Sequence, residues 1–137
     1  MLAGTVLQKE YTVTDPTKIG VTVSTEFLRD HSDPHQNRFA FGYTITVSNH
    51  GKIPARLLTR HWVITDANGV TQEVHGEGVV GEQPLIQPGR SFRYSSGAIL
   101  TTPVGSMHGT YTMVTPNGNY FDAIIPAFRL AMPELVH

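Results

Sequence analysis

The chain has 137 residues, no cysteine, 15% charged residues and a net charge of −1 with histidine neutral. This length predicts one domain that can form its own hydrophobic core without covalent cross-links. The absence of cysteine excludes disulfides, thiolate zinc sites and cysteine nucleophiles. The near-zero net charge predicts no general attraction to nucleic acid or to anionic lipid.

The N-terminal segment lacks the pattern of a secretory signal, because no basic residue precedes its apolar residues and Lys9 and Glu10 follow them closely. No apolar stretch approaches the ~18 residues that a membrane-spanning helix needs. We therefore expect a cytoplasmic protein without a membrane partner.

Alternation of apolar and polar residues is the main structural signal. It is clearest from Phe39 to Val47, where five large apolar side chains recur at every second position, the period of a strand and not of a helix. A similar period predicts six further strands. Their approximate ranges are 19–27, 56–66, 70–75, 91–96, 109–114 and 120–125.

The segments between these strands carry turn sequences. We expect residues 99–108 to be irregular, 116–119 to form a hairpin turn, and Pro126 to end the last strand. The predicted organisation is a loose arm or at most an edge strand at 1–17, a sandwich domain at 18–130, and a tail at 131–137.

The turn at Asp66–Gly69 allows two registers for the hairpin that contains it. A two-residue Asn-Gly turn sets Trp62 opposite His75, whereas a three-residue loop with Gly69 in the left-handed region sets Trp62 opposite Val74. We favour the second register, because it pairs two apolar residues on the core face. It also brings Arg60 close to Gly76.

The pattern as a whole predicts an all-β fold, an immunoglobulin- or fibronectin type III-like β-sandwich of about seven antiparallel strands. Leu58 and Trp62 are expected to point into the core from the third strand, and Tyr111 is expected to form a tyrosine corner near the start of the sixth. Missing cysteines favour the fibronectin-like version.

One glycine-rich segment resembles a dinucleotide-binding motif, with glycines at Gly76, Gly78 and Gly81. That motif works where a helix follows the glycines and receives the pyrophosphate at its N-terminus. Here Pro84 and Pro88 follow, and proline in a helix interior costs ~3 kcal/mol or more. We therefore interpret the segment as a tight, helix-free surface corner.

A second interpretation of the glycine segment remains open. Successive glycine amides can form an anion-binding nest without a helix. Arg60 before the glycines, or Arg90 after them, would add positive charge. Gly76, Gly78, Gly81, Arg60 and Arg90 are therefore the candidate contact residues for an anion or a partner.

No metal, cofactor or catalytic site is predicted. The seven histidines form neither a His-x-His pair nor a His-Glu-x-x-His motif, although His61 and His75 are expected to approach each other across the hairpin. There is no Gly-x-Ser-x-Gly sequence and no paired carboxylates on an evident site. The expectation is a protein that is not an enzyme.

Several motifs together resemble the ApaG family. They are the segment from His75 to Gly89, Phe92-Arg-Tyr-Ser, Gly105-Ser-Met-x-Gly-x-Tyr111, Ile125-Pro-x-Phe-x-Leu130, and Arg60-x-Trp-x-Ile64 with the turn after it. The resemblance covers about residues 18–130.

The resemblance implies a fibronectin type III-like sandwich with no established catalytic residues. It also implies links to cobalt and magnesium tolerance and to diadenosine polyphosphate metabolism. Related domains in eukaryotic proteins look like protein- or ligand-binding modules.

The function expected from the sequence is that of a non-enzymatic interaction domain, with another protein as the partner. The alternative is a binder of nucleotide or pyrophosphate that uses the Gly76–Gly81 loop. An enzyme that acts on dinucleoside polyphosphates ranks last, because no acid, base or metal cluster is evident in the sequence.

Overall fold

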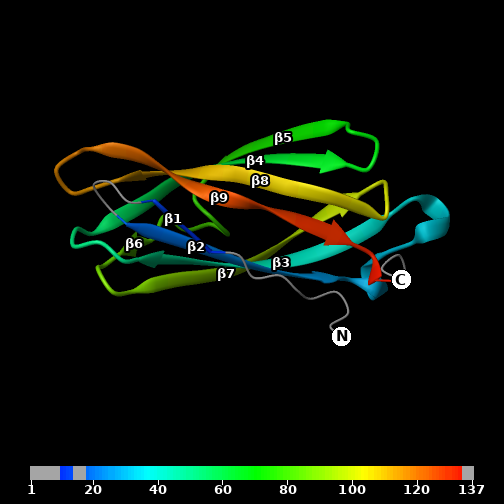
Figure 1. The fold of residues 1–137 in the computed structure, drawn as a ribbon, viewed down its shortest axis with the longest axis horizontal. Helices are drawn as coiled ribbons and strands as arrows, with labels where there is room; N and C mark the ends of the chain where they lie inside the picture. The colour runs from blue at the N-terminus through cyan, green and yellow to red at the C-terminus, as the bar shows by residue number, and fades with distance from the viewer. Residues whose placement is uncertain (1–9, 14–17, 134–137) are drawn as a thin grey trace.

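Two antiparallel sheets face each other in a sandwich in the computed structural model, which describes residues 10–13 and 18–133 (Figure 1). One sheet has the order β1-β2-β3-β7, with β1 at Glu10–Val13, β2 at Ile19–Phe27, β3 at Phe39–Asn49 and β7 at Ser91–Leu100. The other has the order β5-β4-β8-β9, with β4 at Ala55–Asp66, β5 at Thr71–Glu77, β8 at Val104–Val114 and β9 at Tyr120–Ala131. A short strand, β6 at Leu85–Ile86, also pairs with β4.

The helices in this part of the chain are two single 3-10 turns, η1 at Arg29–His31 and η2 at Pro34–Gln36. Neither is long enough to cross a membrane. The all-β class is therefore confirmed. The nine strands of the described residues include β6, which was not predicted, and β1, an edge strand in the segment expected to be a loose arm or at most an edge strand.

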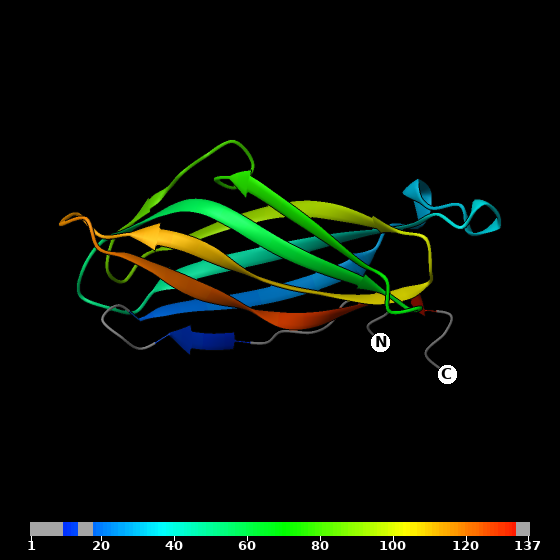
Figure 2. The same cartoon turned by 90° about the horizontal axis from the view of Figure 1, so that it is seen from above.

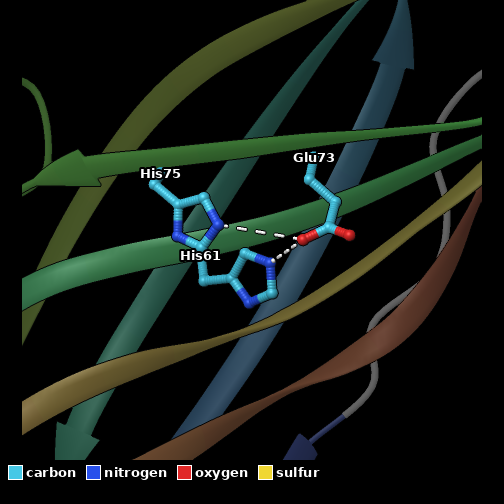
Figure 3. Close-up of side chains that lie close together, drawn as sticks. All are labelled: His61, Glu73 and His75. Carbon is cyan, nitrogen blue, oxygen red and sulfur yellow. Dashed lines mark hydrogen bonds and ion pairs between the residues drawn. The ribbon is translucent and has the colours of Figure 1, made fainter.

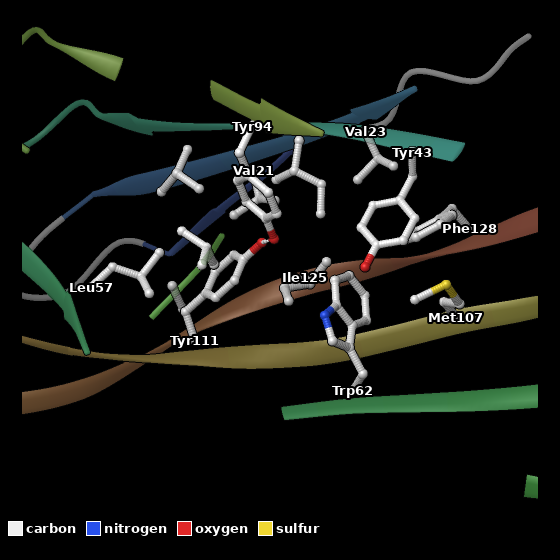
Figure 4. Packing of buried hydrophobic residues seen from close by; sticks show 14 of the residues in the cluster. Val21, Val23, Tyr43, Leu57, Trp62, Tyr94, Met107, Tyr111, Ile125 and Phe128 are labelled. Atoms are coloured by element: carbon white, nitrogen blue, oxygen red, sulfur yellow. Dashed lines mark hydrogen bonds between the residues drawn. The ribbon is translucent and has the colours of Figure 1, made fainter. Parts of the chain in front are cut away.

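The core forms where the alternating faces of the two sheets meet. All five large apolar residues from Phe39 to Val47 are at most 7% exposed, as the alternation predicts. The facing sheet contributes Trp62, Met107, Tyr111 and Ile125 to the same cluster (Figure 4). Burial of these apolar side chains is the main stabilising contribution, at about 25 cal/mol per Å² of apolar surface removed from water.

The sandwich is closed along one side only. There, β9 packs against β2 and β1 of the opposite sheet, so that the two sheets meet at that edge (Figure 2). On the other side, β5 and β7 are the end strands of their sheets. The candidate site lies on this open side, between β5 and β7.

The β4–β5 hairpin has the predicted three-residue register. Trp62 pairs with Val74, and Arg60 pairs with Gly76. Gly69 has a φ of 82°, and its N–H donates to the carbonyl of Asp66. The left-handed conformation explains the glycine, because only glycine adopts it at little cost.

A β-bulge in β4 changes which side chain enters the core. The register against β8 shifts between Leu57 and Thr59. As a result Leu57 is fully buried and Leu58 only half-buried, so the prediction that Leu58 points inward is wrong. A bulge inserts one extra residue and reverses the alternation, which a strict period of two cannot reveal.

The last two long strands are longer than predicted. Residues 99–108 are not an irregular segment, because β7 continues to Leu100 and β8 begins at Val104. Nor does Pro126 end β9, which continues to Ala131. The register shifts between Met107 and Gly109, so that Pro126 lies at a bulge, one of the few sites in a sheet that tolerate proline.

Tyr111 lies in the middle of β8 and its ring is fully buried. Its hydroxyl forms a hydrogen bond with the hydroxyl of Tyr94 across the core, as Figure 4 shows. The predicted tyrosine corner, in which the hydroxyl bonds to a backbone group, is therefore wrong. Burial raises the pKa of both phenols, most strongly through loss of solvation of the charged form.

Candidate functional site

A cleft of about 540 Å³ opens between the end strands β5 and β7 on the unclosed side of the sandwich. Its size lies within the usual range for binding pockets, roughly 300–1,000 Å³. Side chains and backbone from both sheets and from the loop after β2 line it.

The cleft exists because one half of β7 carries small residues. Phe92 and Tyr94 fill the space between the sheets in the first half of the strand, and Tyr94 is only 7% exposed. At the corresponding inward positions farther along lie Ser96 and Ala98. Two side chains this small cannot reach the facing strand β5, so the sheets remain apart there.

Aromatic side chains form the floor of the cleft. Tyr43 contacts Trp62 edge to face, with ring centroids 5.5 Å apart, and Phe128 packs behind both rings. Burial raises the pKa of Tyr43, while a hydrogen bond with Ser96 opposes the shift. Tyr43 is therefore a neutral phenol at physiological pH, and the floor is apolar and uncharged.

The rim of the cleft is cationic. Arg38 lines it from the loop that follows η2, Arg60 lines it from β4, and His31 lies beside them. No aspartate or glutamate lines the cleft among the residues that the structure describes. A ligand with an acidic group next to an apolar surface would match this distribution.

Arg60 also braces the glycine segment that the sequence singles out. Its Nη1 donates to the carbonyls of Glu77 at 3.0 Å and of Gly78 at 2.9 Å. Its guanidinium lies against Gly76, where a Cβ would come within 2.6 Å of it. The structure thus brings together Arg60, Gly76 and Gly78, with the arginine bound to carbonyls of the loop.

The backbone of the glycine loop is largely occupied by its own hydrogen bonds. The N–H of Gly78 donates to Leu58, and Val79 and Glu82 exchange two bonds of 2.8 and 2.9 Å. Val80 and Gly81, with φ values of 42° and 82°, form the tight turn between them. No helix follows within the described residues, as the prolines predict.

Val80 is the unusual residue of this turn. A β-branched residue with positive φ is strained, and it is also 55% exposed at the tip of the loop. Strain of this kind persists only where the surrounding structure imposes it. The loop therefore presents an apolar tip on a rigid support.

Arg90 lies at a different place from the other predicted contact residues. Its carbonyl accepts a hydrogen bond from Asn49 at the end of β3, and its N–H donates to Gln87. No described contact joins it to the glycine loop, so the predicted set divides into one cluster around Arg60 and one separate arginine.

A second group of side chains lies on the outer face of the β4–β5 hairpin. The rings of His61 and His75 stack with centroids 4.2 Å apart, which confirms that they approach each other. Glu73 completes the group and was not predicted. Its place two residues before His75 on one strand was the signal that could have identified it, because residues two apart share a face.

Comparisons with known proteins agree with this description. The family described as "ApaG domain" matches residues 29–115. A "Protein ApaG" from Pseudomonas syringae pv. tomato is 58% identical over 120 residues, which cover 88% of this chain and 95% of that protein. One of the same name from Thiobacillus denitrificans is also 58% identical, with 94% of it covered.

A solved structure extends the agreement to three dimensions. The crystal structure of the putative ApaA protein from Bordetella pertussis has a TM-score of 0.83 and 47% sequence identity, and the match covers 86% of this chain and 96% of that one.

The protein is a small two-sheet β-sandwich, and its open side carries a cleft with an aromatic floor and two lining arginines. The chain belongs to the ApaG family.

Proposed function

We propose that the protein is a non-enzymatic recognition domain that binds an extended segment of a partner protein in the cleft between β5 and β7. The cleft itself is the observation on which the proposal rests. It combines an aromatic floor, two lining arginines and no acidic lining residue within the described chain. The preferred segment is apolar with an acidic side chain.

The position of the cleft supports an extended segment over a small molecule. Both β5 and β7 are end strands, so each has one row of backbone N–H and carbonyl groups without a partner strand in the described sheets. Such edges accept an added strand, in which backbone hydrogen bonds give affinity and alternate side chains give specificity. A segment beside either strand would place alternate side chains over the aromatic floor.

Photo-crosslinking from two matched positions tests the proposal. A photoreactive amino acid replaces Ile99, 51% exposed at the lip of the cleft, or Ile124, 44% exposed on β9 and outside the cleft. We expect a specific crosslinked protein from position 99 and none from position 124. Mass spectrometry then locates the crosslinked segment of the partner.

A synthetic peptide of that segment provides the quantitative test by calorimetry. Ile99→Arg is expected to weaken its binding at least about tenfold, an effect of 1.4 kcal/mol, whereas Ile124→Arg leaves binding unchanged. Crosslinking from position 124 in place of 99, or equal binding by both arginine variants, would show that the cleft is not the binding surface.

Binding of nucleotide or pyrophosphate is the alternative function. Its support is weaker, because the Gly78 amide and Nη1 of Arg60 already donate to carbonyls of the protein. Titration with ATP, diadenosine tetraphosphate and pyrophosphate, followed by backbone amide shifts, distinguishes the two. We expect no saturable shifts in residues 76–81 at millimolar ligand; saturable shifts confined to them would favour the alternative.

A further inference from the structure

Three side chains able to bind a metal ion converge on the outer face of the β4–β5 hairpin, on the opposite face of β4 from Arg60 (Figure 3). They are His61 from β4 and Glu73 and His75 from β5. Their potential ligand atoms all lie within 4.8 Å of one another. None of them lines the cleft of the proposed function.

The hairpin register explains why the two histidines are so close. His61 and His75 are directly opposite each other. The N–H of Gly78 donates to the carbonyl of Leu58, and the N–H of Asp66 donates to the carbonyl of Val70, so both of these opposed pairs are hydrogen-bonded pairs. Hydrogen-bonded and non-hydrogen-bonded pairs alternate along an antiparallel ladder. The pair of His61 and His75 therefore falls at a non-hydrogen-bonded position. At such pairs the side chains come closest, because the Cα atoms are only about 4.5 Å apart.

The nitrogens of the two rings point toward the same carboxylate oxygen. Nε2 of His61 lies 2.9 Å from Oε1 of Glu73, and Nε2 of His75 lies 3.7 Å from the same atom. The rings are nearly parallel, with an interplanar angle of 6°. Two imidazole nitrogens and one carboxylate oxygen thus lie close together on one face of the hairpin.

A bound ion requires contraction of this group and rotation of the stacked rings, because an imidazole nitrogen binds a metal in the plane of its own ring. Zinc binds imidazole nitrogen and carboxylate oxygen at about 2.0–2.2 Å, so ligands of one ion lie roughly 3–3.5 Å apart. The side chains are 34%, 60% and 71% exposed for His61, Glu73 and His75, and therefore have room to move. Water can fill the remaining coordination positions.

The donor set selects the kind of ion. Imidazole suits zinc, copper and nickel, whereas calcium and magnesium prefer six or more oxygen ligands. Glu73 supplies a carboxylate oxygen as the third donor, within 4.8 Å of the histidine nitrogens.

We propose that His61, Glu73 and His75 form an exposed binding site for one borderline divalent transition-metal ion, such as Zn²⁺. The ion joins β4 to β5 and retains positions that face solvent. The three residues are separate from the cleft, so the result of the metal-binding test does not affect the proposed function.

The proposal is tested with untagged protein freed of metal by a chelator and then titrated with ZnCl₂. Calorimetry is expected to show saturable binding of one ion, and imidazole NMR signals of His61 and His75 should shift together. His61→Ala and His75→Ala should each lower the affinity at least about tenfold, since even residues that only orient metal ligands contribute about 10- to 100-fold.

His108 provides the matched control. It is an exposed histidine on β8, paired with Val63 on the neighbouring strand, and is not part of the cluster. His108→Ala should leave zinc affinity unchanged, and Ca²⁺ at tenfold excess should not displace zinc. The amide spectrum of each variant is compared with that of the parent protein, so that loss of binding is separated from loss of the hairpin.

Three results would overturn the proposal. They are unchanged zinc affinity in the His61→Ala/His75→Ala double variant with the hairpin intact, an equal loss in His108→Ala, and absence of saturable binding at millimolar zinc. Displacement of zinc by a tenfold excess of calcium would refute the assignment to a transition metal.

Discussion

The two sides of the sandwich differ in how the same alternating pattern is used. On the closed side, β9 inserts Ile125 and Leu130 between the sheets, and both are at most 1% exposed. On the open side, β7 presents only the small side chains of Ser96 and Ala98 at its inward positions along the cleft. The strands are alike in length and period, so the size of the inward side chains determines whether the edges meet or form a cleft.

This difference places close packing and the open cleft on opposite sides of one small domain. Close packing on the closed side contributes to stability, because Ile125 and Leu130 there are removed from water. The open side gives up some of that burial and retains a cleft. Substitutions on the two sides should therefore have different consequences.

The largest expected effect is on the closed side. Ile125→Ala should lower the free energy of unfolding by about 2–5 kcal/mol, because it removes buried methyl groups and leaves a cavity. Ile99→Ala, on the open side, should change it by less than about 0.5 kcal/mol. Urea denaturation measures both values, and equal losses would show that the open side is packed like the closed one.

Substitutions in the glycine loop should lower the free energy of unfolding nearly as much as Ile125→Ala. Gly78→Ala should cost about 2–4 kcal/mol, because φ is 63° and the new Cβ would overlap the carbonyl oxygen of Glu82. Gly81→Ala should cost only about 1–2 kcal/mol, since φ is 82° but nothing lies within 4 Å. Thermal unfolding ranks the two variants, and the reverse order would contradict the assigned loop geometry.

The hydrogen bond between Tyr94 and Tyr111 crosses the core from one sheet to the other. A double-mutant cycle measures how strongly the two hydroxyls interact. Tyr111→Phe leaves the buried hydroxyl of Tyr94 without its partner and should cost about 1–3 kcal/mol. The double Phe variant should be less destabilised than the sum of the single variants, because both polar groups are then absent. Additive losses in this double-mutant cycle would show that the two hydroxyls do not interact.

Raising the pH above 10 should lower the free energy of unfolding by the smallest amount per residue, and it acts on the same Tyr94–Tyr111 pair. The folded pKa of each tyrosine is raised above its unfolded value near 10, so its contribution is complete below pH 10 and is lost as pH rises toward the folded pKa. The loss should reach about 1 kcal/mol per buried tyrosine about half a pH unit above 10. Denaturation at pH 8 and 10.5 measures it, and the double Phe variant should lose less.

Local patterns predicted those parts of the fold that local chemistry controls. The alternation from Phe39 to Val47 and the Asp66–Gly69 loop each predicted burial or register correctly, because strand period and turn type depend on adjacent residues. Most of the errors involve bulges or distant partners. Leu57 replaces Leu58 in the core, Pro126 lies inside β9, and the hydroxyl of Tyr111 meets Tyr94.

The candidate sites divide in the same way. The sequence predicted that Arg60 lies close to Gly76 and that His61 approaches His75, and both proximities are confirmed. The cleft was not predictable, because its residues come from strands far apart in the chain and its volume depends on how two sheets face each other. Glu73 was missed because its position gains meaning only beside His61 on the neighbouring strand.

The sequence by itself determined the all-β class, the family and the helix-free character of the glycine loop, since period, turn residues and proline act locally. Only the tertiary structure decided that one side of the sandwich closes and the other opens, and that Arg60 faces the cleft while the adjacent His61 faces outward to Glu73. The physical reason is that side-chain packing between sheets and across a hairpin depends on which strands become neighbours.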